Sequence, residues 1–498
     1  MLPQSIITAL AVFGSALVQA IPVLQPRQSA PPKSPPDLAI QQTLNISTGN
    51  PSKCGTGTRY FLQPIDHATY DGTVGDNSTF YQQFEIIDEY FKPGGPILFF
   101  QSTENANMNC LEQLAGPAWA ERLGALVVVL EHRYFGISCP YGLNYTESAT
   151  WPVPLLTPLT LDNVLLDSIT LVEWVQRSSY GGTLAAIARI RYPETFFGSI
   201  ASSLLTTGLV SDPNAPNVFA WGDYANQVYN DFSYEASQRI RSAMSALRSQ
   251  ISSGNFSNLQ QAFNLCTAPS SQRDGDLVAY VLMEQYTENL QNDLSAFGSP
   301  FQTLINATLS LPQNASYLEV LNLANQIHNT FQPVPCVDWE PHFEAVSPYQ
   351  YLQCTYFPQL DGYTANSSIW GLNSPSLFLN SSNGDQSLLD PWCKAAFNIS
   401  SVQGGPAYQA SLGLDTNTLQ KTSRLLLTGG LLDPVTPAGT SPWYGDQPTM
   451  ESSRVYLVQG AGHTADIVAE DPADSDGLKE AKIAYLEMMK AWLAGTDM

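Results

Sequence analysis

The sequence has 498 residues, of which 21 are basic and 44 are acidic, so the chain carries a formal net charge of −23 at pH 7. This balance argues against a nucleic-acid partner, because a phosphate-binding surface needs a basic stripe that releases counterions. Charged residues make up 13% of the chain and apolar residues 44%, so we expect a folded globular protein with a large core rather than a disordered chain.

The N-terminal segment predicts export from the cell. An apolar stretch from Ile6 to Val18 is followed by a plausible cleavage site after Ala20, which predicts a signal peptide over residues 1–20. Residues 21–58 are rich in proline and predict an extended leader or short propeptide. No later stretch approaches the ~18 apolar residues of a membrane span. We therefore expect a secreted protein without a membrane span, with a vacuolar or lysosome-like compartment as the alternative.

Cysteines and glycosylation sequons agree with an oxidising, secretory environment. The seven cysteines are too widely spaced for a zinc cluster, and we expect some to form disulfides while at least one stays unpaired within the chain. Asn-x-Ser/Thr sequons are dense enough to predict a glycosylated surface. The predicted glycosylation sites are Asn45, Asn77, Asn144, Asn255, Asn306, Asn314, Asn366, Asn380 and Asn398.

Two parts of the chain, residues 59–204 and 416–498, together predict one α/β domain. Short apolar runs alternate with helical patterns in both parts, and the runs have the continuous apolar character of buried parallel strands. The predicted core strands are PILFF (96–100), ALVVVL (125–130), RLLLTGG (424–430) and RVYLVQG (454–460).

Residues 205–415 change to helical periodicity and predict a mostly helical cap inserted into the α/β domain. Ser257 with Gln260, and Ser316 with Glu319, have the spacing of capping boxes at helix starts. Such an insertion usually covers an active site, and a purely structural subdomain is the alternative. One predicted helix face consists of Ala236, Ile240, Met244, Leu247 and Ile251.

The histidines limit the choice of a general base. None lies in an HExxH pair or beside a cysteine at ligand spacing, so we expect neither a metal nor another cofactor. His463 is the best placed, because it follows a predicted strand in a glycine-containing loop at the carboxyl edge of the sheet. The five histidines are His67, His132, His328, His342 and His463.

Asp433 and Ser179 complete a catalytic constellation with His463. Asp433 directly follows a predicted strand, and Pro434 fixes the turn after it. Ser179 precedes two glycines and a run of small residues, where a sharp turn would expose its hydroxyl above the sheet. The order Ser, Asp, His along the chain is that of the α/β-hydrolases.

In the mechanism that this order predicts, His463 takes the proton of Ser179 while Asp433 orients the imidazole and stabilises its protonated form. The backbone N–H of Tyr180 is one predicted oxyanion donor. The other is expected in the loop after PILFF, near Ser102 and Thr103.

A family resemblance supports this assignment. Seven segments resemble, in order, the lysosomal Pro-X carboxypeptidase family, which includes dipeptidyl peptidase II and fungal secreted prolyl peptidases. They are QPIDHATY, GGPILFFQSTEN, LEHRYFGIS, SSYGGTLAAIARIRYPETFFGSIASS, YQYLQCTYF, LTGGLLDPVTP and GAGHTADI. The resemblance runs from about residue 59 to the C-terminus and is strongest in GGPILFF, EHRYFG and SYGG.

The resemblance implies an α/β-hydrolase domain with a helical cap and a serine exopeptidase that cleaves proline-containing peptides. Ser179, Asp433 and His463 carry over as nucleophile, orienting acid and base. Peptide substrates are the expected partners. Carboxypeptidase and dipeptidyl peptidase modes both stay open, and the sequence predicts no oligomeric state.

The chain departs from the family around the nucleophile. Relatives have Gly-Gly-Ser-Tyr-Gly-Gly, whereas this chain places Arg177 two positions before the serine. Relatives also have a helix, a loop and a buried strand before this turn, whereas here a helical pattern over residues 161–175 runs almost into it. The alternative is that ITLVEWV (169–175), which is rich in β-branched residues, is itself the strand that leads into the turn. The spacing of three and four residues favours the helix, and on that interpretation a strand of about five or six residues is absent. The alternative prediction is a catalytically impaired secreted glycoprotein of the same fold.

Overall fold

The computed structural model describes residues 58–75, 77–102, 114–143, 151–171, 177–178, 180–206, 209, 220–339, 347–358, 389–439 and 453–496. The predicted signal peptide and residues 21–57 of the predicted leader lie outside these ranges, and Thr58 begins the first strand. Within the same ranges, no helix combines the length and the apolar character that crossing a bilayer requires.

The strands form two four-stranded sheets, with the orders β1-β2-β4-β3 and β5-β6-β7-β8. Strands β3 and β4 are parallel, and so are all strands of the second sheet, whereas β2 is antiparallel to both β1 and β4. Strands β3, β4, β7 and β8 are the four predicted core strands, so that prediction is confirmed. The bounds are β1 Thr58–Pro64, β2 Thr79–Ile87, β3 Ile97–Gln101, β4 Leu126–Leu130, β5 Arg177–Ser178, β6 Ser199–Ser202, β7 Leu425–Gly430 and β8 Ser453–Val458.

Strands β1 and β2 were not among the predicted elements, because polar side chains occupy buried positions in both. Gln63 of β1 is fully buried, and its Nε2 donates to the carbonyl oxygen of Asp167 at 2.8 Å. Gln82 of β2 is also buried and donates to the carbonyl oxygen of Glu131 at 2.7 Å. These hydrogen bonds provide partners for the buried Nε2 groups, and the buried polar side chains erase the apolar alternation by which a half-buried strand is recognised.

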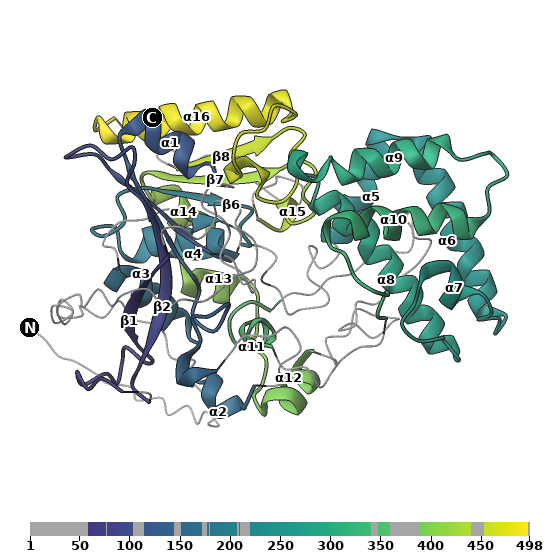
Figure 1. Cartoon of the computed structure of the whole chain (residues 1–498), viewed down its shortest axis with the longest axis horizontal. Coiled ribbons are helices and arrows are strands. Elements are labelled where there is room, and N and C mark those ends of the chain that lie inside the picture. The colour runs from purple at the N-terminus through teal and green to yellow at the C-terminus, as the bar shows by residue number, and fades with distance from the viewer. Residues whose placement is uncertain are drawn as a thin grey trace, which may run out of the picture.

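Helices cover both faces of the sheets (Figure 1). Along β4, Val127 and Val129 belong to one apolar cluster and Val128 and Leu130 to another, because successive side chains of a strand point to opposite faces. The first cluster includes side chains of α1 and α16, and the second includes side chains of α3 and α4. Helices of this part are α1 Gly116–Leu123, α2 Val153–Leu156, α3 Leu161–Leu171, α4 Tyr180–Arg191, α14 Thr416–Lys421, α15 Thr436–Gly439 and α16 Asp476–Leu493.

Strand β5 has only two residues. Helix α3 extends to Leu171 and β5 begins at Arg177, and residues 172–176, which include the end of the predicted helical pattern, lie outside the described residues. Arg177 pairs with Ala201 and Ser178 with Ser202 of β6. On its other side β5 lies close to β3 but forms no ladder with it, so the two sheets are separate at this point.

The chain between β6 and β7 is helical in its described parts. Helices α5 to α10 pack around an apolar cluster of their own and form the teal and green bundle beside the sheets in Figure 1. Helices α11 to α13 instead pack with the α/β part. The bounds are α5 Ala220–Phe232, α6 Tyr234–Ser252, α7 Leu259–Phe263, α8 Gln272–Gln291, α9 Pro300–Ser310, α10 Tyr317–Phe331, α11 Pro348–Thr355, α12 Leu389–Phe397 and α13 Pro406–Leu412. The architecture is an α/β-hydrolase fold with a mostly helical insertion.

The helix predictions in this insertion have mixed outcomes. All five residues of the predicted helix face are buried on α6, and Ser316 with Glu319 forms the predicted capping box of α10. The capping box of Ser257 and Gln260 is wrong. Helix α7 begins after Asn258, which has the left-handed φ of 73°, and the hydroxyl of Ser257 turns back to the side chain of Asn255.

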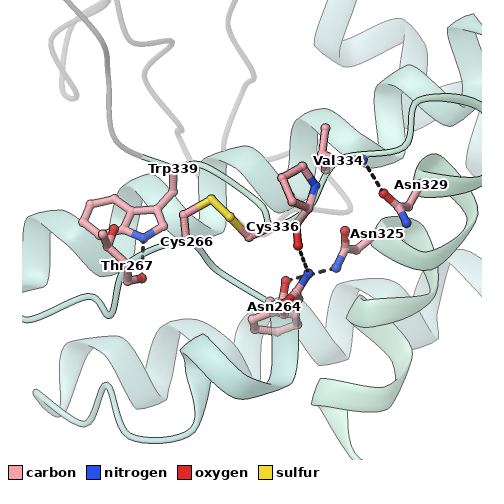
Figure 2. The surroundings of a disulfide bond; sticks show 10 residues. Asn264, Cys266, Thr267, Asn325, Asn329, Val334, Cys336 and Trp339 are labelled. Carbon is pink, nitrogen blue, oxygen red and sulfur yellow. Dashed lines mark hydrogen bonds between the residues drawn. A yellow bond between two sulfur atoms is a disulfide. The ribbon is translucent and has the colours of Figure 1, made fainter.

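Two disulfides join described cysteines, namely Cys266–Cys336 and Cys354–Cys393. Cys54 and Cys110 lie outside the described residues, and Cys139 is buried with its Sγ 3.6 Å from the carbonyl oxygen of Gly136. Figure 2 shows that the Cys266–Cys336 bond lies between the segment after α7 and the segment after α10. Beside it, the indole Nε1 of Trp339 donates to the carbonyl oxygen of Thr267 at 2.9 Å.

Removal of the Cys266–Cys336 disulfide should destabilise the helical insertion. The bond closes a loop with a sequence separation of 70 residues, for which the chain-entropy model gives about 4 kcal/mol. In a Cys266→Ala/Cys336→Ala variant we expect faster hydrogen exchange across residues 259–339 and a lower denaturant midpoint. A Cys354→Ala/Cys393→Ala variant is the control, because these cysteines pack in the α/β core. Equal exchange of the insertion in all three proteins would contradict the prediction.

Candidate active site

The candidate site lies at one edge of the second sheet. Because β5, β6, β7 and β8 are parallel, their carboxyl ends lie at the same edge. Asp433 follows β7 and His463 follows β8. Ser179 lies outside the described residues, between Ser178 at the end of β5 and Tyr180 at the start of α4.

Asp433 and His463 face each other at this edge. Nδ1 of His463 lies 2.8 Å from Oδ2 of Asp433. The Asp433 side chain is completely buried, whereas that of His463 keeps 20% of its exposure. This geometry suits a carboxylate that orients an imidazole while the rest of the ring remains accessible to a reacting group.

The turn after β7 fixes the Asp433 carboxylate. Its Oδ1 accepts a hydrogen bond from the backbone N–H of Val435 at 3.0 Å, so each carboxylate oxygen has a different partner. The carbonyl oxygen of Gly430 accepts from the backbone N–H of Asp433 at 3.1 Å and from the hydroxyl of Thr436 at 2.6 Å. A buried carboxylate requires such partners, because an unpaired buried charge is strongly destabilising.

The loop that carries His463 is bound on several sides. The backbone N–H of Leu432, beside Asp433, donates to the carbonyl oxygen of Ala461 at 2.9 Å. Thr464 has a left-handed φ of 55°, and its N–H donates to the hydroxyl of Ser203 at 3.0 Å. Ser203 directly follows β6, the strand that pairs with β5. The loop is therefore joined to both β7 and β6.

Asp466 forms a polar network below this loop that the sequence analysis missed. Its Oδ1 accepts from the hydroxyl of Ser202 at 2.6 Å, and its Oδ2 accepts from Thr428 at 2.5 Å and Tyr485 at 2.8 Å. All four residues are buried. Burial and the Asp466 charge raise the pKa of Tyr485 well above its usual range, so the phenol stays a donor. The sequence signal that could have revealed this network was the presence of two polar residues, Ser202 and Thr428, in buried strands.

The structure changes one of the oxyanion predictions. The N–H of Ser102 donates to the carbonyl oxygen of Leu130 at 2.8 Å, which extends the ladder between β3 and β4. Ser102 is therefore not the second oxyanion donor, and Thr103 lies outside the described residues. Tyr180 is the first residue of α4. The backbone N–H groups at this end of a helix are available to an anion.

The helix that follows the nucleophile position packs closely on the sheet. A Cβ atom at Gly182 would lie 2.2 Å from the carbonyl oxygen of Ser202, so only glycine fits there. Ala185 and Ala186 are buried on the same helix. This contact brings the start of α4 against β6 and bears out the expected need for small residues after Ser179.

Comparison with known proteins supports the family resemblance. Residues 63–294 match the family model of the serine carboxypeptidase S28 peptidases. A lysosomal Pro-X carboxypeptidase of Mus musculus is 23% identical over 477 residues, which cover 87% of this chain and 88% of that protein. These matches confirm the resemblance found in the sequence: the chain is similar to the serine carboxypeptidase S28 family, and it is a serine-type peptidase.

Other relatives agree with this resemblance. The thymus-specific serine protease of Homo sapiens is 22% identical over 463 residues, 84% of each chain. The human lysosomal Pro-X carboxypeptidase is 34% identical over 161 residues, which cover 29% of this chain and 31% of that protein. A solved proline iminopeptidase of Mycobacterium smegmatis covers 88% of this chain and 99% of its own at 11% identity, and its TM-score of 0.34 is too low to carry an argument.

Other polar residues of this serine-type peptidase have structural partners away from Asp433 and His463. Arg133 is fully buried and donates two hydrogen bonds of 2.6 Å to the carboxylate of Asp167, which also lies 2.8 Å from Nε2 of His67. The aromatic residues around 349–357 pack on or in the α/β core. Across the described ranges, no group of three His, Cys, Asp or Glu side chains is arranged to hold a metal ion.

Two buried carboxyl groups have raised pKa values. Burial raises the pKa of Glu131 from 4.5 to about 7, and the nearby charge of Glu85 adds to the effect. Burial also raises the pKa of Asp293, in the segment that joins α8 to α9, from 3.8 to about 6. In both cases the folded state binds the proton more tightly than the unfolded state, so the contribution of these groups to stability falls as the pH rises from the ordinary carboxyl pKa toward the raised values, and it levels off above them.

The protein should therefore be more stable at pH 5 than at pH 8. Because one pKa unit corresponds to about 1.4 kcal/mol, each ionised group lowers the free energy of unfolding by about 3 kcal/mol at high pH. Glu131→Gln and Asp293→Asn should each flatten this dependence, whereas Glu121→Gln should not, because Glu121 is exposed. Urea denaturation at both pH values measures the effect. A free energy of unfolding at pH 5 that is equal to or lower than the value at pH 8 would contradict the prediction.

Proposed function

We propose that this peptidase is a secreted serine exopeptidase that cleaves proline-containing peptides through a Ser179, Asp433 and His463 acyl-enzyme mechanism. The observation that carries the proposal is the 2.8 Å contact between Asp433 and His463 at the sheet edge where the chain also leaves β5 toward residue 179. The family resemblance and the chain order of the three residues agree with it.

In the proposed mechanism, Nδ1–H of His463 donates to Asp433, and Nε2 accepts the hydroxyl proton of Ser179. The serine oxygen then attacks the carbonyl carbon of the substrate, and the N–H of Tyr180 stabilises the oxyanion. His463 gives its proton to the leaving amine as the C–N bond breaks. Water attacks the acyl-enzyme by the reverse sequence and releases the serine.

The substrate class rests on the relatives. The mouse, bovine and human proteins named lysosomal Pro-X carboxypeptidase support proline recognition. We propose peptides as substrates, with a secreted or lysosome-like location. The exposed sequon residues support a glycosylated surface. The sequon asparagines that are described, all of them exposed, are Asn77, Asn255, Asn306, Asn314 and Asn398, and Asn45, Asn144, Asn366 and Asn380 lie outside the described residues.

A fluorophosphonate probe tests the mechanism. The protein secreted from a eukaryotic host should form one adduct at Ser179, found by peptide mass spectrometry, and Ser179→Ala should abolish it. Asp433→Asn should slow peptide hydrolysis by about 10⁴-fold, because the imidazole would lose its orienting carboxylate. Ser178→Ala is the matched control and should keep the adduct. An adduct that forms equally on Ser179→Ala would refute the assignment of the nucleophile.

Peptide substrates separate the two exopeptidase modes. A carboxypeptidase should release one residue from a peptide with proline at the penultimate C-terminal position and should not act on its C-terminal amide. A dipeptidyl peptidase should release a dipeptide from a substrate with proline second from the N-terminus and should not act on its N-acetyl form. We expect one of these two patterns in product analysis by mass spectrometry. Cleavage of both blocked peptides would contradict an exopeptidase.

The second candidate function is a non-catalytic secreted glycoprotein of the same fold. The two-residue length of β5 favours it, because a short strand gives the nucleophile turn little support from the sheet. This candidate predicts a folded protein without a fluorophosphonate adduct and without peptide hydrolysis. The labelling experiment therefore decides between the two functions.

A further inference from the structure

We infer that the helical insertion positions the catalytic acid and base, because two of its helices contact the turns that carry Asp433 and His463. In this inference Tyr224 is a positioning residue for Asp433. The inference rests on the proposed function. It differs from the ordinary expectation for a cap, which covers the substrate and excludes water but leaves the acid and base to be positioned by the sheet.

The first attachment joins the insertion to His463. The backbone N–H of His463 donates to the carbonyl oxygen of Gln291, the last residue of α8, at 2.7 Å. The neighbouring Gly462 approaches the same segment so closely that a Cβ atom would lie 2.6 Å from the Gln291 oxygen and 2.9 Å from the nitrogen of Asp293. The histidine loop is thus seated on the carboxyl end of α8, where helix carbonyl groups lack partners within the helix.

The second attachment joins the insertion to the turn of Asp433. The buried hydroxyl of Tyr224, on α5, donates to the carbonyl oxygen of Leu431 at 2.9 Å, two residues before the carboxylate. Burial, with the nearby charge of Asp433, raises the pKa of Tyr224 to about 12, so its hydroxyl remains a donor. Leu432 lies between these groups, and its side chain belongs to the apolar cluster of the insertion.

The two attachments act together because α5 and α8 are joined to each other. The hydroxyl of Tyr229, one and a half turns beyond Tyr224 on α5, donates to the carbonyl oxygen of Tyr286 on α8 at 2.8 Å, and the two rings meet edge to face. One rigid helix pair therefore contacts both turns and sets their separation. A small change in the position of α5 relative to α8 would move the carboxylate relative to the imidazole, and a catalytic hydrogen bond is sensitive to such a displacement.

Tyr224→Phe tests this role by removing one hydroxyl. We expect kcat to fall about ten-fold with KM nearly unchanged, which corresponds to the loss of one positioning hydrogen bond. The fluorophosphonate labelling rate should fall in parallel. In proton NMR, the downfield Nδ1–H resonance of His463 should shift or broaden, and His463→Ala identifies that resonance. Tyr134→Phe is the matched control, because it removes a buried hydroxyl that donates to the carbonyl oxygen of Leu155, outside both attachments.

The control should lose stability without changing kcat or the His463 resonance. A Tyr224→Phe protein with wild-type kcat and resonance would overturn the inference, and so would equal effects of the two variants, because these would indicate stability alone. Should the wild type show no turnover, the proposed function fails, yet the resonance comparison still tests the attachment.

Gly462→Ala tests the attachment to α8 in the same way. The added methyl group would displace the loop from Gln291, so we expect a larger loss of kcat than in Tyr224→Phe. Gly75→Ala is its control, because a Cβ atom there meets no atom closer than 3.8 Å. Retention of wild-type kcat and of the His463 resonance by Gly462→Ala would also overturn the inference.

Discussion

The arrangement of the site depends on one buried hydrogen-bonded pair. Asp433 is completely buried, and an ionised carboxylate in that position is tolerated only when its oxygens have partners. Val435 supplies one partner and His463 the other. The turn after β7 and the loop after β8 therefore have to meet, and the hydrogen bond from Leu432 to Ala461 joins their backbones. Much of the surrounding structure keeps these two segments in contact.

The support for this pair comes from three directions. Below it, the carboxylate of Asp466 draws together hydroxyl groups from β6, β7 and α16. Beside it, Ser203 joins the histidine loop to the end of β6. Above it, Gln291 and Tyr224 extend from the insertion. The acid and base thus have a nearly complete scaffold although β5, the strand that leads to the nucleophile position, has only two residues.

The charge distribution suits a protein that works in acid. The chain has an excess of 23 acidic groups, whose mutual repulsion decreases as they take up protons. Glu131 and Asp293 add two buried sites at which the folded state prefers the proton. Asp293 lies in the segment that also crowds Gly462, so the attachment of the insertion to the histidine loop contains one of these groups. The segment between α8 and α9 therefore contributes both to stability in acid and to the position of the histidine loop.

The sequence by itself determined the elements whose signals are local. Continuous apolar runs predicted β3, β4, β7 and β8, because strands buried on both faces need no polar positions. Spacing of three and four residues predicted α6 and α3. Chain order and glycine placement singled out Asp433 and His463. Apart from chain order, each of these signals is local in the sequence.

Only the tertiary structure decided the contacts between distant segments. Strands β1 and β2 escaped prediction because their buried polar side chains bond to residues that lie far away in the sequence. The sequence predicts the second oxyanion donor near Ser102 and Thr103, but only the fold shows that the N–H of Ser102 donates to the carbonyl oxygen of Leu130. Asp466, Gln291 and Tyr224 carry no local signature, because their roles arise from hydrogen bonds across 19 to 264 residues of chain. Such bonds depend on where the fold brings each group, which periodicity and composition do not encode.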